Sequence, residues 1–308
     1  MGRKRAIAVA AAGLLAATTL PCGAVVFESS GDSSRNTTPP TGAWAGSGWS
    51  NVVPIGAFLG TVIHSNALLV ARHTDLGVGS TFSWDGHTYS VTGLADDVAA
   101  DTDLRVLFFN GGLSNVARLQ AASDETGRWT VVQGRGRERG STVVSAGRTN
   151  GWKWGAATWV RRWGVNRFEG YADLWTNGDS LLAWASFDAG MDSNECMLSE
   201  FDSSGPAFVN AAGGWRCVGV ASYVDPALFS PTGSSTDQFV ATCFDYGGLY
   251  YWGGTGAWYY ADPAAGPWPC IFLISRVAPR LGWLTNVVPG LVLRDDPPRR
   301  AGTAVVVR

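Results

Sequence analysis

Short apolar runs that alternate with glycine-, asparagine- and aspartate-rich turns limit most strongly how this chain can fold. Residues 81–84 and 87–91 are two such runs joined by Asp85-Gly86, a dipeptide that favours a two-residue hairpin turn. The 40 glycines suit further turns, and no long helical periodicity precedes the C-terminal region. We therefore predict an all-β protein built as a barrel or a sandwich.

The N-terminal residues have the pattern of a secretory signal. Basic residues at 3–5 precede an apolar run over 6–20, and small residues follow at 22–24, which is the order of a cleavable leader. The apolar run is too short to span a bilayer comfortably. We predict cleavage after Ala24, so that 1–24 is a signal peptide, and export of a chain without a membrane span. Lipid modification of Cys22 is the alternative, and the residues before it suit that poorly.

The mature chain has a modest negative charge. Beyond residue 24 it holds 20 basic and 25 acidic side chains, a net charge of −5, which does not favour nucleic acid or an anionic membrane as a partner. No Cys-x-x-Cys or His-x-x-x-His spacing occurs, so we predict no metal and no cofactor. Four cysteines remain, and an even number in an exported chain predicts two disulfides with three possible pairings. They are Cys196, Cys217, Cys243 and Cys270.

One histidine of three is placed as a catalytic base would be. His73 follows the apolar run 67–71, and a buried strand that ends there would present the imidazole at a cleft. His64 and His87 stand in polar, turn-like surroundings instead. A hydroxyl nucleophile needs such an imidazole to take its proton. The alternative for His73 is a hydrogen-bonded structural histidine.

A carboxylate stands in the next motif along the chain. Asp103 leads directly into the largely apolar run 104–107, where an unpaired carboxylate would be costly to bury and an imidazole N–H would be a suitable partner. Asp96, Asp97 and Asp101 are rivals, but none leads directly into an apolar run. The alternative is that Asp103 caps a turn together with Asp101.

The third motif is Phe-Asp-Ser-Ser-Gly-Pro at 201–206. It resembles the Gly-Asp-Ser-Gly-Gly-Pro loop around the nucleophile of trypsin-like serine proteases, and the chain order His, Asp, Ser is that of chymotrypsin. Matching Asp202 and Ser203 to the family's Asp-Ser keeps the final Gly-Pro in register, which selects Ser203 over Ser204 as nucleophile. The alternative is a plain surface turn.

From about 41 to 288 the chain resembles the chymotrypsin-like double β-barrel family, and more closely a bacterial secreted branch with a Gly-Arg-Gly turn and a tryptophan-rich second barrel. The resemblance implies a peptidase domain over 25–290, with a first barrel at about 42–120 and a second at about 121–290. The segment 274–284 is similar to the family's closing strand and short helix. The tail 291–308 is predicted to be disordered.

The resemblance also implies roles for the nucleophile loop. The backbone N–H groups of Phe201 and Ser203 would stabilise the oxyanion, although the family has glycine in place of Phe201 and of Ser204. A non-glycine residue at positive φ is strained, so a catalytically weak or inactive protein that binds extended peptides is the alternative to a serine endopeptidase. A new amine at Val25 would be placed to pair with Asp202, as new N-termini do in this fold.

Specificity is predicted from the strand that follows the nucleophile. Ser222, Tyr223 and Val224 stand where the family binds an extended peptide or protein substrate, and Met197 stands at the base of the primary pocket. Without a carboxylate at that base, we predict cleavage after small or medium apolar residues. Asp225 would overturn this prediction if it entered the pocket.

An aromatic-rich insertion occupies 226–269. We expect its rings to pack on the barrel as a satellite core, and an exposed sugar- or peptide-binding surface is the alternative. Cys243 with Cys270 would brace the insertion, and Cys196 with Cys217 would fix the nucleophile loop. The aromatic residues are Phe239, Phe244, Tyr246, Tyr250, Tyr251, Trp252, Trp258, Tyr259, Tyr260 and Trp268.

Overall fold

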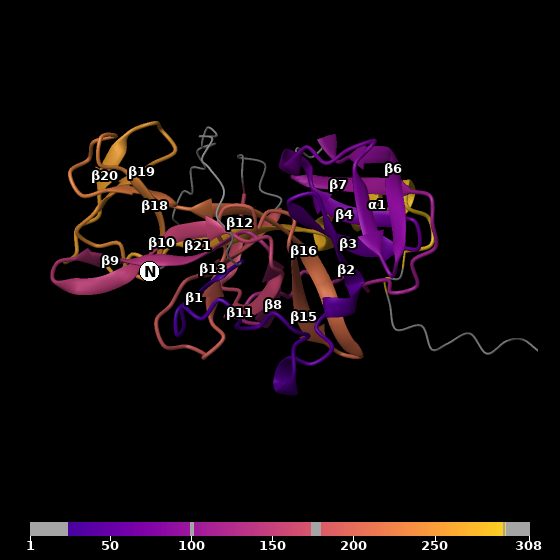
Figure 1. Cartoon of the computed structure of the whole chain (residues 1–308), viewed down its shortest axis with the longest axis horizontal. Helices are drawn as coiled ribbons and strands as arrows, with labels where there is room; N and C mark the ends of the chain where they lie inside the picture. The colour runs from indigo at the N-terminus through magenta and orange to yellow at the C-terminus, as the bar shows by residue number, and fades with distance from the viewer. Residues whose placement is uncertain (1–23, 99–101, 174–179, 292, 294–308) are drawn as a thin grey trace, which may run out of the picture.

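The computed structural model describes residues 24–98, 102–173, 180–291 and 293. The predicted signal peptide therefore lies outside the described residues apart from Ala24, and so does most of the predicted tail. Figure 1 shows three groups of strands side by side, with the N-terminal sheet at one end and the aromatic insertion at the other.

The first sheet has the strand order β2-β3-β4-β7-β6-β5, and its edge strands β2 and β5 lie against each other, which closes it into a barrel. Its hairpin at Asp85-Gly86 has φ values of 49° and 77°, so the predicted turn is confirmed. The strands are β2 (Val52–Ile55), β3 (Phe58–His64), β4 (Ala67–Ala71), β5 (Thr81–Trp84), β6 (His87–Asp96) and β7 (Leu104–Phe109).

The second sheet has the order β11-β8-β15-β16-β21-β13-β12. Long β16 connects the nucleophile region to the aromatic insertion (Figure 1). The strands are β8 (Trp129–Gly134), β11 (Arg162–Arg167), β12 (Gly170–Ala172), β13 (Leu182–Ser186), β15 (Pro206–Ala211), β16 (Gly214–Asp225) and β21 (Ile271–Arg276).

The insertion forms a third sheet with a hairpin that precedes it in the chain, in the order β20-β19-β17-β18-β10-β9. Phe229 and Tyr246 are buried in the same core cluster as the second barrel, as expected for a satellite core, whereas Tyr259 and Tyr260 are 41% and 53% exposed. The strands are β9 (Arg137–Ser145), β10 (Arg148–Ala157), β17 (Leu228–Ser230), β18 (Phe239–Cys243), β19 (Tyr250–Trp252) and β20 (Trp258–Tyr260).

Helical structure among the described residues is short. The last helical elements are the 3-10 turn η5 (Ala278–Arg280) and α1 (Leu281–Val287). Leu284 of α1 packs into the core cluster beside the first barrel. The remaining turns are η1 (Gly42–Trp44), η2 (Trp49–Asn51) and η3 (Arg72–Thr74). In the part of the chain that the structure describes, no helix has the length and apolar character needed to cross a membrane. Barrel-like β-sheets with a short C-terminal helix confirm the predicted chymotrypsin-like fold.

The predicted disulfides are wrong, because all four cysteines are free and buried. Cys196 belongs to the core of the second barrel and Cys217 to a different core cluster beside the first, so their side chains are not neighbours. Cys243 and Cys270 are adjacent, with the Cys243 N–H donating to Cys270 Sγ at 3.1 Å, and no disulfide joins them.

Candidate active site

Two neighbouring strands of the first barrel bring a histidine and an aspartate together. His73 lies in η3 directly after β4, Asp103 directly precedes β7, and Ala71 pairs with Leu104 across these strands. The His73 N–H donates to Asp103 Oδ1 at 2.9 Å, and His73 Nδ1 lies 2.6 Å from Asp103 Oδ2. The aspartate is buried while the His73 side chain is 39% exposed. One carboxylate therefore fixes both the backbone and the ring of His73.

The nucleophile loop of the second barrel completes the group. Ser203, between β14 (Cys196–Met197) and β15, has its Oγ 2.7 Å from His73 Nε2. With Nδ1 facing the carboxylate, the neutral imidazole carries its proton on Nδ1 and accepts from the serine hydroxyl through Nε2. The three predicted side chains thus lie in one continuous hydrogen-bonded chain across the two barrels.

The rival residues occupy other places. Asp96 forms an ion pair with Arg105, and Asp97 forms one with Arg280. Asp101 lies outside the described residues. His64 Nδ1 lies 2.6 Å from the side chain of its near neighbour Asn66, and His87 is exposed at the start of β6.

Ser204 has a structural contact. It is fully buried, and its Oγ accepts the Ala71 N–H at 3.0 Å. This bond ties the nucleophile loop to the end of β4, next to η3 and its histidine. Ser203, by contrast, is partly exposed and faces the imidazole. The structure therefore separates the two serines in the way that the register of the motif requires.

Phe201 adopts the backbone conformation that a glycine would take there, with φ of 72°. Its ring packs at 5.0 Å from the Trp159 ring and 6.5 Å from that of Phe58, between ring centroids, and the Arg137 guanidinium lies 5.5 Å from its centre. Neither the Phe201 nor the Ser203 N–H donates a hydrogen bond to any residue within the described ranges. Both donors are therefore available to an oxygen at this loop.

Asp202 holds the loop from inside. Its buried carboxylate accepts the N–H groups of Gly136 at 2.7 Å, Ser199 at 2.8 Å and Val25 at 3.3 Å, and the Ser199 hydroxyl at 2.8 Å. Burial raises the pKa of Asp202 to about 6, against the opposing effect of these donors. Val25 itself is fully buried and has φ of 47°, a strained value for a β-branched residue.

Sequence reasoning placed Val25 beside Asp202 but did not assign the other residues that support this carboxylate, although one signal was present. A Cβ on Gly134 would collide with the Asp202 carboxylate, and a Cβ on Gly136 would collide with the backbone of Glu200. The Gly-Arg-Gly turn that contributed to the family resemblance is therefore required by the close approach of the nucleophile loop.

The predicted substrate strand carries alternate side chains to opposite faces. The Tyr223 ring stacks near the His73 ring, with centroids 6.1 Å apart. Val224 packs against the core of the second barrel. Met197 is fully buried in that core with Phe272, and the buried Ser222 hydroxyl donates to Ser275 Oγ at 2.8 Å. Tyr223 therefore faces the histidine, while Val224 and Met197 lie with the apolar core of the second barrel.

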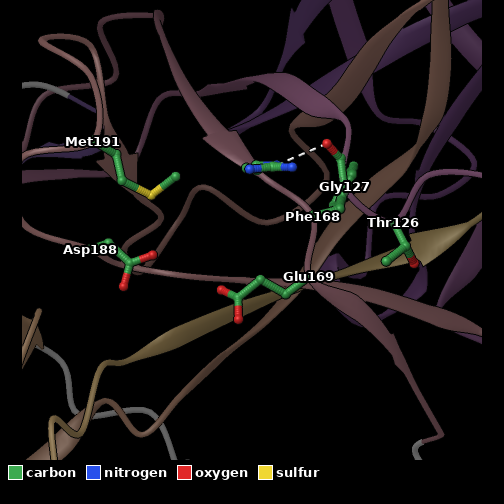
Figure 2. A pocket seen from close by; sticks show the side chains of 7 residues that line it. Thr126, Gly127, Phe168, Glu169, Asp188 and Met191 are labelled. Atoms are coloured by element: carbon green, nitrogen blue, oxygen red, sulfur yellow. Dashed lines mark hydrogen bonds between the residues drawn. The ribbon is translucent and has the colours of Figure 1, made fainter.

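Concave surface occurs away from these residues. A cavity of about 360 Å³ lies on the second barrel (Figure 2), where Arg167 donates to the Gly127 carbonyl at 2.9 Å. Glu169 and Asp188 also line it. None of its lining residues belongs to the His73 group. Among the described residues there is no cluster of three or more His, Cys, Asp or Glu side chains that could hold a metal ion.

Neither a protein-family model nor a curated protein matches the chain. Among solved structures, the chain is similar to one described as human heparin binding protein, with a TM-score of 0.44 and 16% sequence identity. That alignment covers 77% of this chain and 91% of the other.

Proposed function

We propose that this protein is a serine endopeptidase. The observation that carries the proposal is the hydrogen-bonded chain Asp103, His73, Ser203, with distances of 2.6 and 2.7 Å. Ser203 Oγ attacks the peptide carbonyl while His73 Nε2 takes its proton, and Asp103 holds the imidazole in the required tautomer. His73 then protonates the leaving amine, and a water molecule repeats the sequence to release the acyl group.

Charge on the carbonyl oxygen is stabilised by the backbone. The N–H groups of Phe201 and Ser203 are the proposed donors, since both lack a partner among the described residues and the positive φ of Phe201 is the one the loop needs. One such donor is typically worth about 10²–10³ in rate. The buried Asp202 network keeps the loop in this conformation.

Substrate choice follows from the strand beside the nucleophile. The proposed substrate is an extended peptide or protein segment that pairs with β16. Met197 is fully buried, and Val224 packs on the same core, so the residue before the scissile bond is small or, at most, medium-sized and apolar. The leader-like N-terminus supports action in the cell envelope or outside the cell.

Labelling with a fluorophosphonate probe tests the proposal. We expect the wild-type protein to react at Ser203, as located by peptide mapping of the adduct, and Ser203→Ala to remain unlabelled. Ser204→Ala is the matched control: it loses the acceptor for the Ala71 N–H, which costs about 1 kcal/mol of stability, and it keeps labelling. Absence of labelling in a folded wild-type protein, or loss of labelling only in Ser204→Ala, would refute the proposal.

The burial of Met197 in the apolar core favours one second candidate, a protein that holds extended peptides without cutting them. Such a protein would bind peptides through the edge of β16. It would bind them equally well as wild type and as Ser203→Ala, and it would not react with the probe. The two experiments together separate catalysis from binding.

A further inference from the structure

The pairing of β16 changes next to the nucleophile. β15 pairs with β16 only as far as Val220, and two further backbone bonds join Ala221 to the nucleophile loop, from Ser204 N–H to Ala221 O and from Ala221 N–H to Gly205 O. From Tyr223 to Asp225, β16 pairs with β21 along one edge, and no strand of the described residues pairs with this stretch along the other edge. A peptide bound at Ser203 therefore has the edge at 223–225 to pair with.

The side chain of Asp225 is on the same face of this strand as that of Tyr223. The register against β21 is regular here, with Tyr223, Val224 and Asp225 opposite Leu273, Phe272 and Ile271. Because successive side chains of a strand alternate, and Tyr223 faces His73 while Val224 faces the core, Asp225 faces the Tyr223 side. It cannot enter the space around Met197. It lies about 7 Å beyond Tyr223 along the strand.

The Asp225 carboxyl has no compensating group. It forms no hydrogen bond or ion pair through its side chain with any residue in the described ranges, although it is only partly exposed. Burial raises its pKa to about 6, with no charged neighbour contributing to the shift. A half-buried carboxylate without a partner is costly, and a ligand cation placed beside it would remove that cost.

The direction of the peptide fixes which of its residues meets this carboxylate. β16 runs from Ser222 near the triad to Asp225 farther away. A peptide paired antiparallel to it runs from Asp225 toward Ser203, so the residue beside Asp225 precedes the scissile bond. Asp225 lies two residues beyond Tyr223, which faces His73. The substrate residue beside Asp225 therefore lies about two to four residues before the scissile bond.

We propose that Asp225 is a specificity-determining residue that selects a lysine or arginine side chain about two to four residues before the scissile bond. The inference rests on the proposed peptidase function and deepens it. The substrate class is thus an extended chain with a small residue at the cleavage point and a basic residue upstream. Asp225 acts on the substrate side chain and takes no part in the chemical steps.

A set of fluorogenic peptides tests this assignment. Each peptide has alanine before the scissile bond and lysine, glutamine or glutamate at one of the four preceding positions. At one position we expect lysine to exceed glutamine by about tenfold in kcat/KM, with glutamate lowest. Asp225→Asn should bring the lysine-to-glutamine ratio close to one. The control Asp85→Asn, at an exposed hairpin turn, should keep the preference.

A ratio near one at all four positions in the wild type would overturn the inference, as would a lysine preference that survives Asp225→Asn. If the proposed peptidase function is wrong, the wild-type protein will not be labelled by the fluorophosphonate probe, which is a separate result. In that case the affinity of Ser203→Ala for the same peptides, measured by fluorescence anisotropy, decides the role of Asp225. A lysine preference in binding that Asp225→Asn removes supports the inference, and equal affinities refute it.

Discussion

Glu195 is a buried acid whose protonation should govern the pH dependence of stability. It directly precedes β14 and is fully buried; its Oε1 accepts the Asp188 N–H at 2.8 Å, while its Oε2 has no hydrogen-bond partner among the described residues. Burial raises its pKa from the ordinary 4.5 to about 8, and the carboxylates of Asp188, Glu28 and Asp192 contribute in the same direction. The folded protein therefore holds Glu195 protonated at neutral pH.

The direction and size of the effect follow from this shift. Below pH 4.5 the side chain is protonated in both the folded and the unfolded state, and its contribution to stability is fully present. As the pH rises from 4.5 to 8 only the unfolded state releases the proton, so the free energy of unfolding falls. With 1.36 kcal/mol for each pH unit, the loss reaches about 3 kcal/mol at pH 7 and about 5 kcal/mol above pH 8.

Glu195→Gln keeps the shape of the protonated acid and removes the titration. Urea unfolding at pH 5 and at pH 8.5 should show that the variant gains several kcal/mol relative to wild type over this interval. Asp202 and Asp225, whose pKa values burial also raises, titrate in both proteins and cancel in the difference. Glu138→Gln serves as a control at a partly exposed glutamate. Parallel pH profiles for wild type and Glu195→Gln would refute the reasoning.

Two further predictions concern the nucleophile loop. Phe201→Gly should leave the rate of fluorophosphonate labelling within about threefold of wild type, because the φ of 72° already has the sign that glycine would supply; a rise approaching the 10²–10³ that one oxyanion donor is worth would show that Phe201 distorts the loop. A chain processed to begin at Val25 should unfold at a higher temperature at pH 7.5 than the same chain with an acetylated N-terminus, because a free ammonium would face the buried Asp202 carboxylate, to which the Val25 N–H now donates at 3.3 Å. Equal unfolding temperatures would exclude that ion pair.

Local sequence was enough to place His73 and Asp103 each beside a buried strand, whereas the choice of Ser203 came from the family resemblance. His73 and Asp103 each adjoin a buried strand, and the pairing of Ala71 with Leu104 makes those strand ends neighbours. The Asp85-Gly86 hairpin likewise depends on two residues and their backbone preferences. In each case the information lies within a few residues of the feature that it determines.

Features that depend on distant packing could not be obtained in this way. Cysteine count does not reveal that Cys196 and Cys217 belong to different cores. The position of Met197 relative to the nucleophile does not reveal that Phe272, from the other side of the insertion, packs in the same core. The face of β16 from which the Asp225 side chain projects depends on the regular register between β16 and β21. No local sequence pattern specifies that register.

The departures from glycine in the nucleophile loop have compensating contacts outside the motif. A non-glycine residue at positive φ costs about 1–3 kcal/mol, and both Phe201 and Ser204 have such values. The Phe201 ring contacts Phe58, and the Ser204 hydroxyl accepts the N–H of Ala71; both partners belong to the first barrel. The strained loop is therefore held by the interface that also places His73 opposite Ser203, so a change that loosens the two barrels should disturb the loop conformation and the triad distances together.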